Sequence, residues 1–172
     1  MDFQTKCLVV ALNTIKSVEL TTPCEPEELC ARLDEAGFPN ILSPRPMIGR
    51  VTGYCEKDEH GQHALIFDSN ATREQQRVYI CHEVGHMIAL HPLTGLICAR
   101  SSNLSDPRER EAEMIGYWLN ELITIPNVVR YEMTSDFRML MERINNRNQG
   151  QRGCRSAPRP SWVAWFFGRG RR

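Results

Sequence analysis

The sequence lacks a long apolar run, a C-x-x-C cysteine pair and a secretory signal pattern. A helix that spans a bilayer needs ~18 or more apolar residues in succession. The apolar run at 7–12 is broken by Asn13, so it is also too short for the hydrophobic region of a signal peptide. The cysteines number seven, and an odd count is atypical of a secreted disulfide framework. These absences predict a cytoplasmic protein with free thiols and no transmembrane segment.

Acidic residues are absent after Glu142, whereas seven arginines occur from Arg147 onward. The chain has 21 basic and 21 acidic residues, so residues 1–146 hold 14 basic and 21 acidic side chains, a net charge of −7 against +7 for the remainder. The basic part also carries an aromatic cluster at 162–167. We therefore expect one domain over 1–146 and a flexible basic tail over 147–172.

The composition of the tail admits more than one role. Arginines beside aromatic side chains suit single-stranded nucleic acid or an anionic membrane surface. A solvated tail, or one that folds back on the acidic domain, explains the same composition. The domain itself shows no evident helix-turn-helix pattern, so we do not expect it to bind DNA directly.

Hydrophobic periodicity and turn residues predict several helices and a short set of strands. The expected helices cover 3–18, 25–36, 72–90, 105–123 and 127–146, and the expected strands cover 38–42, 50–55 and 63–67. Asp58-Glu59-His60-Gly61 is expected as the turn between the last two strands. Thr72 is one candidate to cap the third helix, and Ser105 or Asp106 the fourth. This order predicts an α+β domain in which a small, mostly antiparallel sheet packs against an active-site helix and further helices.

The third predicted helix contains His82-Glu83-Val84-Gly85-His86, which matches the pattern H-E-x-x-H. Residues four apart lie on the same face of a helix, so both imidazoles can bind one metal ion. Zinc lowers the pKa of a bound water to about 7, and Glu83 is placed to take that proton. Burying these groups in an apolar helix without a partner would be costly. We therefore predict one Zn²⁺ per chain on His82 and His86, with Glu83 as catalytic base.

A catalytic zinc site also needs a third protein ligand and one open position. The metzincin pattern is excluded, because Ala89 and Pro92 stand where it requires glycine and histidine. The fourth predicted helix offers Glu109 and Glu113 on one face, whereas Glu111 points about 200° away from Glu109 and is expected in solvent. We favour Glu109 as the third ligand and Glu113 as a group that orients a liganding histidine; Glu113 as the ligand is the alternative.

Small residues accompany these candidates on both helices. Gly85, in the middle of a helix, costs about 1 kcal/mol relative to alanine, which suggests close approach of another element. Ala112 and Gly116 share a helix face with Glu109. We expect the two helices to pack closely and to bring Glu109 to the histidines. The competing interpretation is an exposed acidic stripe paired with neighbouring arginines.

Several segments resemble the ImmA/IrrE family of zinc metallopeptidases. The likeness covers the strand and turn at 64–70, the zinc helix at 73–86, an E-x-x-A segment at 109–116 and a Leu-Ile-Thr-Ile-Pro segment at 122–126. His91 matches a histidine often found shortly after the zinc motif of that family. The sequence departs from the pattern at Glu113, where asparagine or aspartate is usual. The resemblance implies a minimal gluzincin-like, zincin-type domain with Glu109 as the third ligand.

The resemblance also implies a function. Members of the family act inside bacteria, and several cleave helix-turn-helix transcriptional repressors that control phage, mobile-element or stress genes. We therefore expect a metalloendopeptidase acting on such a repressor; the alternative is a zinc-containing protein that binds a repressor without cleaving it. Cleavage also needs a donor to the developing oxyanion. His91, Tyr79 and Tyr131 are the candidates, and a packing or surface role competes for each.

Overall fold

The computed structural model describes residues 1–49, 51–91, 98–99 and 106–130. The chain divides into two compact units, Met1–Met133 and Thr134–Arg172, and every described residue belongs to the first. The predicted domain boundary after residue 146, the basic tail and Tyr131 lie outside the described residues. The same holds for the predicted helix at 127–146 beyond residue 130.

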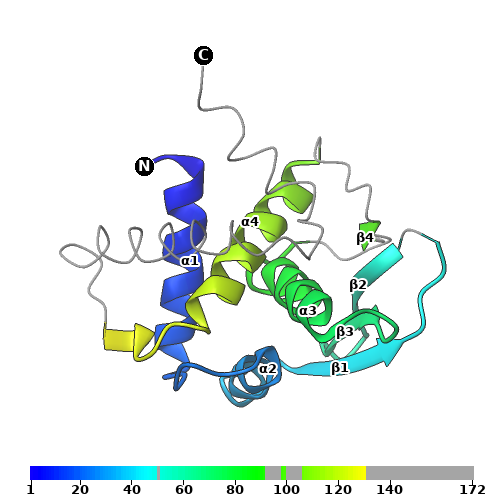
Figure 1. The fold of residues 1–172 in the computed structure, drawn as a ribbon, viewed down its shortest axis with the longest axis horizontal. Coiled ribbons are helices and arrows are strands. Elements are labelled where there is room, and N and C mark those ends of the chain that lie inside the picture. Colours follow the sequence, from blue (N-terminus) through cyan, green and yellow to red (C-terminus); the bar gives the residue numbers. More distant parts are fainter. Residues whose placement is uncertain (50, 92–97, 100–105, 131–172) are drawn as a thin grey trace. The chain divides into compact units, whose positions relative to one another are not determined.

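The first unit has an α+β fold, as predicted (Figure 1). Its elements in chain order are α1 (Phe3–Ser17), α2 (Pro26–Glu35), β1 (Asn40–Arg45), β2 (Val51–Lys57), β3 (His63–Asp68), α3 (Arg73–Ile88), β4 (Cys98–Ala99), α4 (Pro107–Leu122) and the 3-10 helix η1 (Val128–Arg130). The short strand β4 falls in a segment for which the sequence predicts no strand. It is held by pairing with β2, a long-range contact that local sequence does not reveal.

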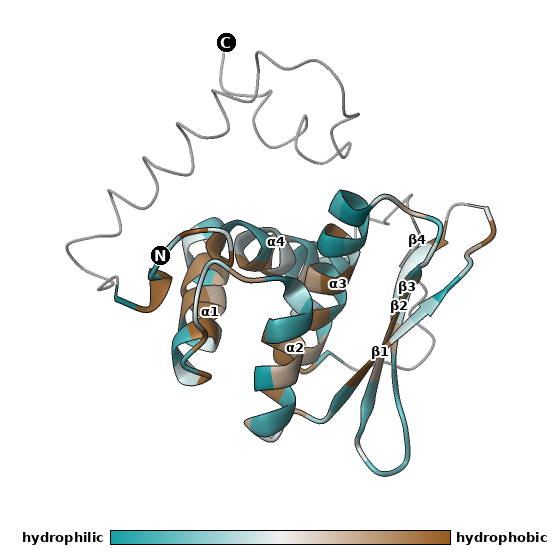
Figure 2. Cartoon of the chain, turned by 60° about the horizontal axis from the view of Figure 1, so that its bottom comes forward, coloured by the Kyte–Doolittle hydropathy of each residue, from teal (hydrophilic) through white to brown (hydrophobic). Residues whose placement is uncertain are grey.

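The four strands form one mixed sheet in the order β1-β3-β2-β4. β2 and β3 form the predicted antiparallel hairpin, in whose turn the Gly61 N–H donates to the Asp58 carbonyl oxygen over 3.1 Å. β1 pairs with β3 in parallel and places Asn40 opposite His63, while β2 and β4 are antiparallel. The sheet is therefore mixed, with two antiparallel pairings and one parallel pairing. In Figure 2 the helices lie on one side of it.

Local side chains explain where α3 and α4 begin. Thr72 and Gln75 form a reciprocal capping box, in which the Thr72 side chain accepts from the Gln75 N–H and the Gln75 side chain accepts from the Thr72 N–H. The Asp106 side chain accepts from the Arg108 N–H over 2.9 Å, with Pro107 in the first turn of the helix. The predicted caps at Thr72 and Asp106 are confirmed. They fix the start of the two helices that carry the candidate site.

Cys7, Cys24, Cys30, Cys55 and Cys81 are free thiols, as predicted. Four of the five are buried, and burial raises the pKa of Cys7 to about 11 and that of Cys30 to about 12. A thiol with such a pKa is protonated at neutral pH and is a poor nucleophile. Among the described helices, none is long and apolar enough to cross a membrane.

Candidate metal centre

The candidate site lies where α3 and α4 pack against each other at very short distance. A methyl group added at Gly85 would lie 2.5 Å from the Ala112 carbonyl oxygen, and one at Gly116 would lie 2.7 Å from the Cα of His82. Side-chain carbons do not approach other atoms so closely, so the two backbones can meet here only because both residues are glycines. The predicted close packing is confirmed. It brings the acidic face of α4 to the histidines of α3.

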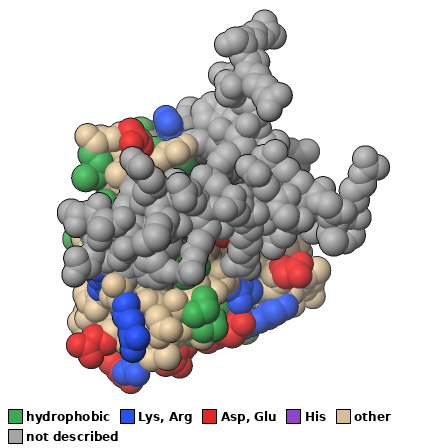
Figure 3. All heavy atoms as spheres, turned by 60° about the vertical axis from the view of Figure 1, so that its left-hand side comes forward, with side chains coloured by type: hydrophobic (Ala, Val, Ile, Leu, Met, Phe, Trp, Pro, Cys, Tyr) green, Lys and Arg blue, Asp and Glu red, His purple; other side chains and the backbone are tan. Residues whose placement is uncertain are grey.

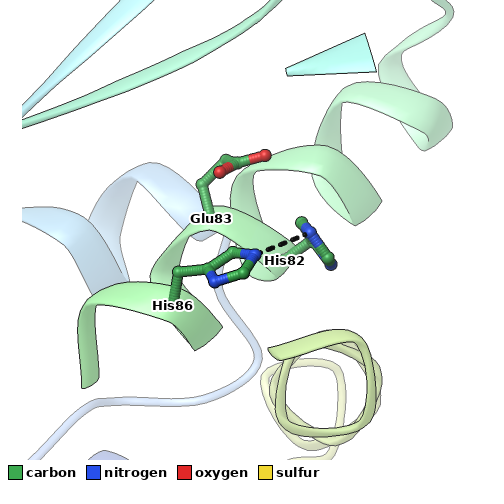
Figure 4. A group of neighbouring side chains, drawn as sticks. All are labelled: His82, Glu83 and His86. Atoms are coloured by element: carbon green, nitrogen blue, oxygen red, sulfur yellow. Dashed lines mark hydrogen bonds between the residues drawn. The ribbon is translucent and has the colours of Figure 1, made fainter. Parts of the chain in front are cut away.

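Three side chains converge between these helices. The Nε2 atoms of His82 and His86 are 3.2 Å apart, and the Glu109 carboxylate lies 3.6 Å from the first and 3.4 Å from the second. His82, Glu83 and His86 also each offer one potential ligand atom within 4.8 Å of the others, so this group could hold a metal ion. Figure 4 shows the two imidazole rings meeting, with the Glu83 carboxylate beside them.

The spacing of the donor atoms fits zinc. Two ligand atoms bound at about 2.1 Å in a tetrahedron are about 3.4 Å apart. The two Nε2 atoms are 3.2 Å apart, and each lies within 3.6 Å of one oxygen of Glu109, Oε2 for His82 and Oε1 for His86. Imidazole nitrogen and carboxylate oxygen are both common zinc ligands. The Glu109 carboxylate is thus a donor of a suitable type beside both histidine nitrogens.

Glu113, one turn further along α4, contacts the opposite nitrogen of His82. Its Oε2 lies 2.9 Å from His82 Nδ1. The His82 ring therefore lies between two carboxylates, with Nδ1 facing Glu113 and Nε2 facing Glu109. Of the two acids, Glu109 thus adjoins both Nε2 atoms, whereas Glu113 contacts the far side of one ring.

The electrostatics of the pocket favour an ionised Glu109 and a neutral His86. Burial raises the pKa of Glu109, but its contacts with His82 and His86 outweigh burial and hold this pKa well below its usual range. Burial lowers the pKa of His86, against the opposing effect of Glu109. Zinc binds imidazole and carboxylate in these protonation states. Glu109 is 7% exposed, so the competing interpretation as an exposed acidic stripe is wrong for this residue.

Glu83 lies on the sheet side of the site. It is 1% exposed, and a methyl group added at Gly53 of β2 would lie 2.9 Å from its Oε1. The absence of a side chain at Gly53 therefore leaves the space that the carboxylate occupies. Sequence reasoning did not single out Gly53, although a glycine inside a predicted strand is a known sign of close approach by another group.

The candidate oxyanion donors fall in different places. His91 Nδ1 lies 3.0 Å from His86 Nδ1, so it contacts the ring nitrogen that faces away from Glu109. Tyr79 is half-buried on α3, one turn before His82, and Tyr131 is outside the described residues. The expectation that Glu111 lies in solvent is wrong, because its side chain is 30% exposed and its Oε2 lies 3.3 Å from His91 Nε2. The structure therefore places His91 on the side of the His86 ring opposite Glu109.

Two imidazoles on α3 and one carboxylate on α4 thus lie within 3.6 Å of one another, with buried Glu83 beside them and Glu113 in contact with one imidazole. This arrangement can bind a divalent cation and move a proton next to it. Comparisons with protein-family models, with curated proteins and with solved structures found no match to this chain.

Proposed function

We propose that this chain is a zinc-dependent peptidase that hydrolyses peptide bonds of a protein substrate. The observation that carries the proposal is the convergence of His82 Nε2, His86 Nε2 and the Glu109 carboxylate at 3.2 to 3.6 Å. A buried carboxylate, Glu83, follows the first of these histidines on the same helix. His82, His86 and Glu109 would hold one zinc ion, which leaves a position of the tetrahedron open for substrate or water.

The roles of the side chains follow from their positions. A bound zinc ion supplies a water of lowered pKa and polarises the substrate carbonyl. Glu83 takes the proton of the attacking water and passes it to the amine that leaves. Glu113 keeps the His82 ring in the orientation that its ligand role needs. Gly53 leaves room for the Glu83 carboxylate between α3 and β2.

The substrate class rests on the resemblance to ImmA/IrrE peptidases. On that ground the preferred substrate is a helix-turn-helix repressor encoded beside this gene. Zinc binding and proton transfer are supported by the site itself and do not depend on this choice of substrate.

The test compares the wild-type chain with Glu83→Gln and with Glu74→Gln, an exposed acid in the first turn of the same helix. Each protein is loaded with zinc and incubated with the repressor and with casein, and products are followed by mass spectrometry. Loss of a general base typically lowers the rate by about 10²–10⁴-fold. We expect that loss for Glu83→Gln with its zinc retained, and no change for Glu74→Gln.

Two results count against the proposal. Equal cleavage by Glu83→Gln and the wild-type chain would remove Glu83 from the mechanism. Binding of the repressor by all three proteins without cleavage by any of them would favour the alternative, a zinc-containing regulatory protein that binds without cutting.

A further inference from the structure

A row of hydrogen-bonded side chains begins at the nitrogen of His86 that faces away from Glu109. His86 Nδ1 lies 3.0 Å from His91 Nδ1, and His91 Nε2 lies 3.3 Å from Glu111 Oε2. The His91 side chain is 7% exposed, so water has little access to its ring. The row connects α3, the residues that follow it, and α4.

The acid at the end of this row determines where each hydrogen lies. The Glu111 carboxylate only accepts, so the hydrogen of a neutral His91 ring sits on Nε2 and its Nδ1 becomes an acceptor. His86 must then donate from Nδ1, which leaves the lone pair of its Nε2 directed at Glu109 and His82. That tautomer is the one that can bind a metal at Nε2.

The backbone after α3 is shaped to make this contact. Leu90 has a φ of +55°, in the left-handed region that residues other than glycine rarely adopt. Its side chain gains little from burial, because the residue is 74% exposed. The turn lets the His91 N–H donate to the His86 carbonyl oxygen over 3.2 Å and returns the His91 ring to His86.

We propose that His91 and Glu111 are positioning residues that fix the tautomer and orientation of His86 for metal binding. The inference rests on the metal site of the proposed function but not on peptidase activity. It gives the two histidine ligands different supports. Glu113 contacts His82 directly, whereas Glu111 is connected to His86 through hydrogen bonds of His91.

The test uses two substitutions of His91 that differ in hydrogen bonding. Glutamine can accept from His86 and donate to Glu111, whereas leucine fills space without either bond. Zinc affinity is measured by chelator competition. We expect His91→Leu to weaken zinc binding by about 10–100-fold, as for other residues that orient a ligand, and His91→Gln to recover most of that loss. Glu111→Gln should weaken binding in the same direction, and adding it to His91→Leu should cause no further loss.

A second readout needs no metal. In the metal-free wild-type chain, long-range ¹H–¹⁵N NMR of the histidine rings should find the His86 hydrogen on Nδ1, and His91→Leu or Glu111→Gln should give a mixture of tautomers. Equal zinc affinity of the leucine and glutamine variants, or a wild-type His86 with its hydrogen on Nε2, would overturn the positioning role of His91 and Glu111. If the wild-type chain binds no zinc, the proposed function fails, while the NMR result still decides whether His91 and Glu111 fix the His86 tautomer. Should His91→Leu not fold, Glu111→Gln carries the same test.

Discussion

The two ends of α3 carry similar polar groups in very different surroundings. At its first turn, Arg73 contacts Glu27 over 2.6 Å, with side chains that are 50% and 40% exposed. Near its last turn, His82, His86 and Glu109 contact one another with side chains that are at most 11% exposed. Acidic and basic side chains also adjoin on the described part of the surface shown in Figure 3.

The two ends differ in whether the stability of the fold alone accounts for their polar side chains. Exposed ion pairs contribute about 0–1 kcal/mol, and removing them costs correspondingly little. Buried polar groups lose their contacts with water, which is costly unless they are well paired. A cation bound between two imidazoles and a carboxylate would offset that cost. The buried end of α3 therefore points to a function, whereas the exposed end joins α2 to α3.

The largest expected effect is that of Glu109→Gln on zinc affinity. The substitution removes the carboxylate that lies beside both histidine Nε2 atoms, and we expect a loss greater than the about 10–100-fold typical of residues that only orient a ligand. Glu27→Gln is the matched control at the exposed end, and it should leave zinc affinity unchanged. Chelator competition measures both. Similar zinc affinities of the two variants would contradict the claim that only the buried end of α3 binds the metal.

The next effect concerns the close packing of α3 on α4. Alanine is a better helix former than glycine by about 1 kcal/mol, so Gly85→Ala would stabilise an unobstructed helix. Here the added methyl group meets the Ala112 carbonyl oxygen, and we expect a loss of about 1–3 kcal/mol in the free energy of unfolding in urea. The control is Ala31→Gly at an exposed position of α2, which measures the effect of helix propensity on the free energy of unfolding. A gain in stability for Gly85→Ala would show that α4 leaves room for a side chain at this position.

The smallest effect is the pH dependence of stability in the metal-free chain. Burial lowers the pKa of His86 in the folded state below the usual 6.5, so the unfolded chain takes up this proton first as pH falls. The unfolded state then binds more protons, and stability declines with decreasing pH below about 6.5. Glu109, whose pKa is also lowered, adds a further decline below about 4.5.

Urea unfolding between pH 7.5 and 5.5 measures the first of these declines, with His86→Gln as the control that lacks the titrating ring. We expect a smaller decline for His86→Gln than for the wild-type chain. Stability that stays constant or rises as pH falls through this window would contradict the buried, neutral state of His86.

Local sequence is sufficient for much of the fold and for part of the site. The i, i+4 spacing of His82 and His86 needs only a helix, and the caps at Thr72 and Asp106 depend on residues within three positions. Gly85 indicates close packing, because a glycine inside a helix lowers its stability unless a neighbouring element needs the space. Periodicity on α4 then places Glu109 and Glu113 on the face that meets α3.

The remaining features depend on contacts between distant segments. Glu111 points away from Glu109 on the helix, and it reaches the site only because the left-handed turn at Leu90 places His91 between Glu111 and His86. Gly53 adjoins Glu83 through packing of β2 on α3. The parallel pairing of β1 with β3 joins segments about twenty residues apart, and alternation within a strand does not determine its partner.

The metal content of the 172-residue chain, purified without chelators, tests the zinc site most directly. Inductively coupled plasma mass spectrometry should find one zinc ion per wild-type chain and essentially none in His86→Ala, with Glu83→Gln still loaded. A folded wild-type chain that holds no zinc, even after incubation with zinc sulfate and removal of the free ion, would contradict the assignment of His82, His86 and Glu109 as zinc ligands.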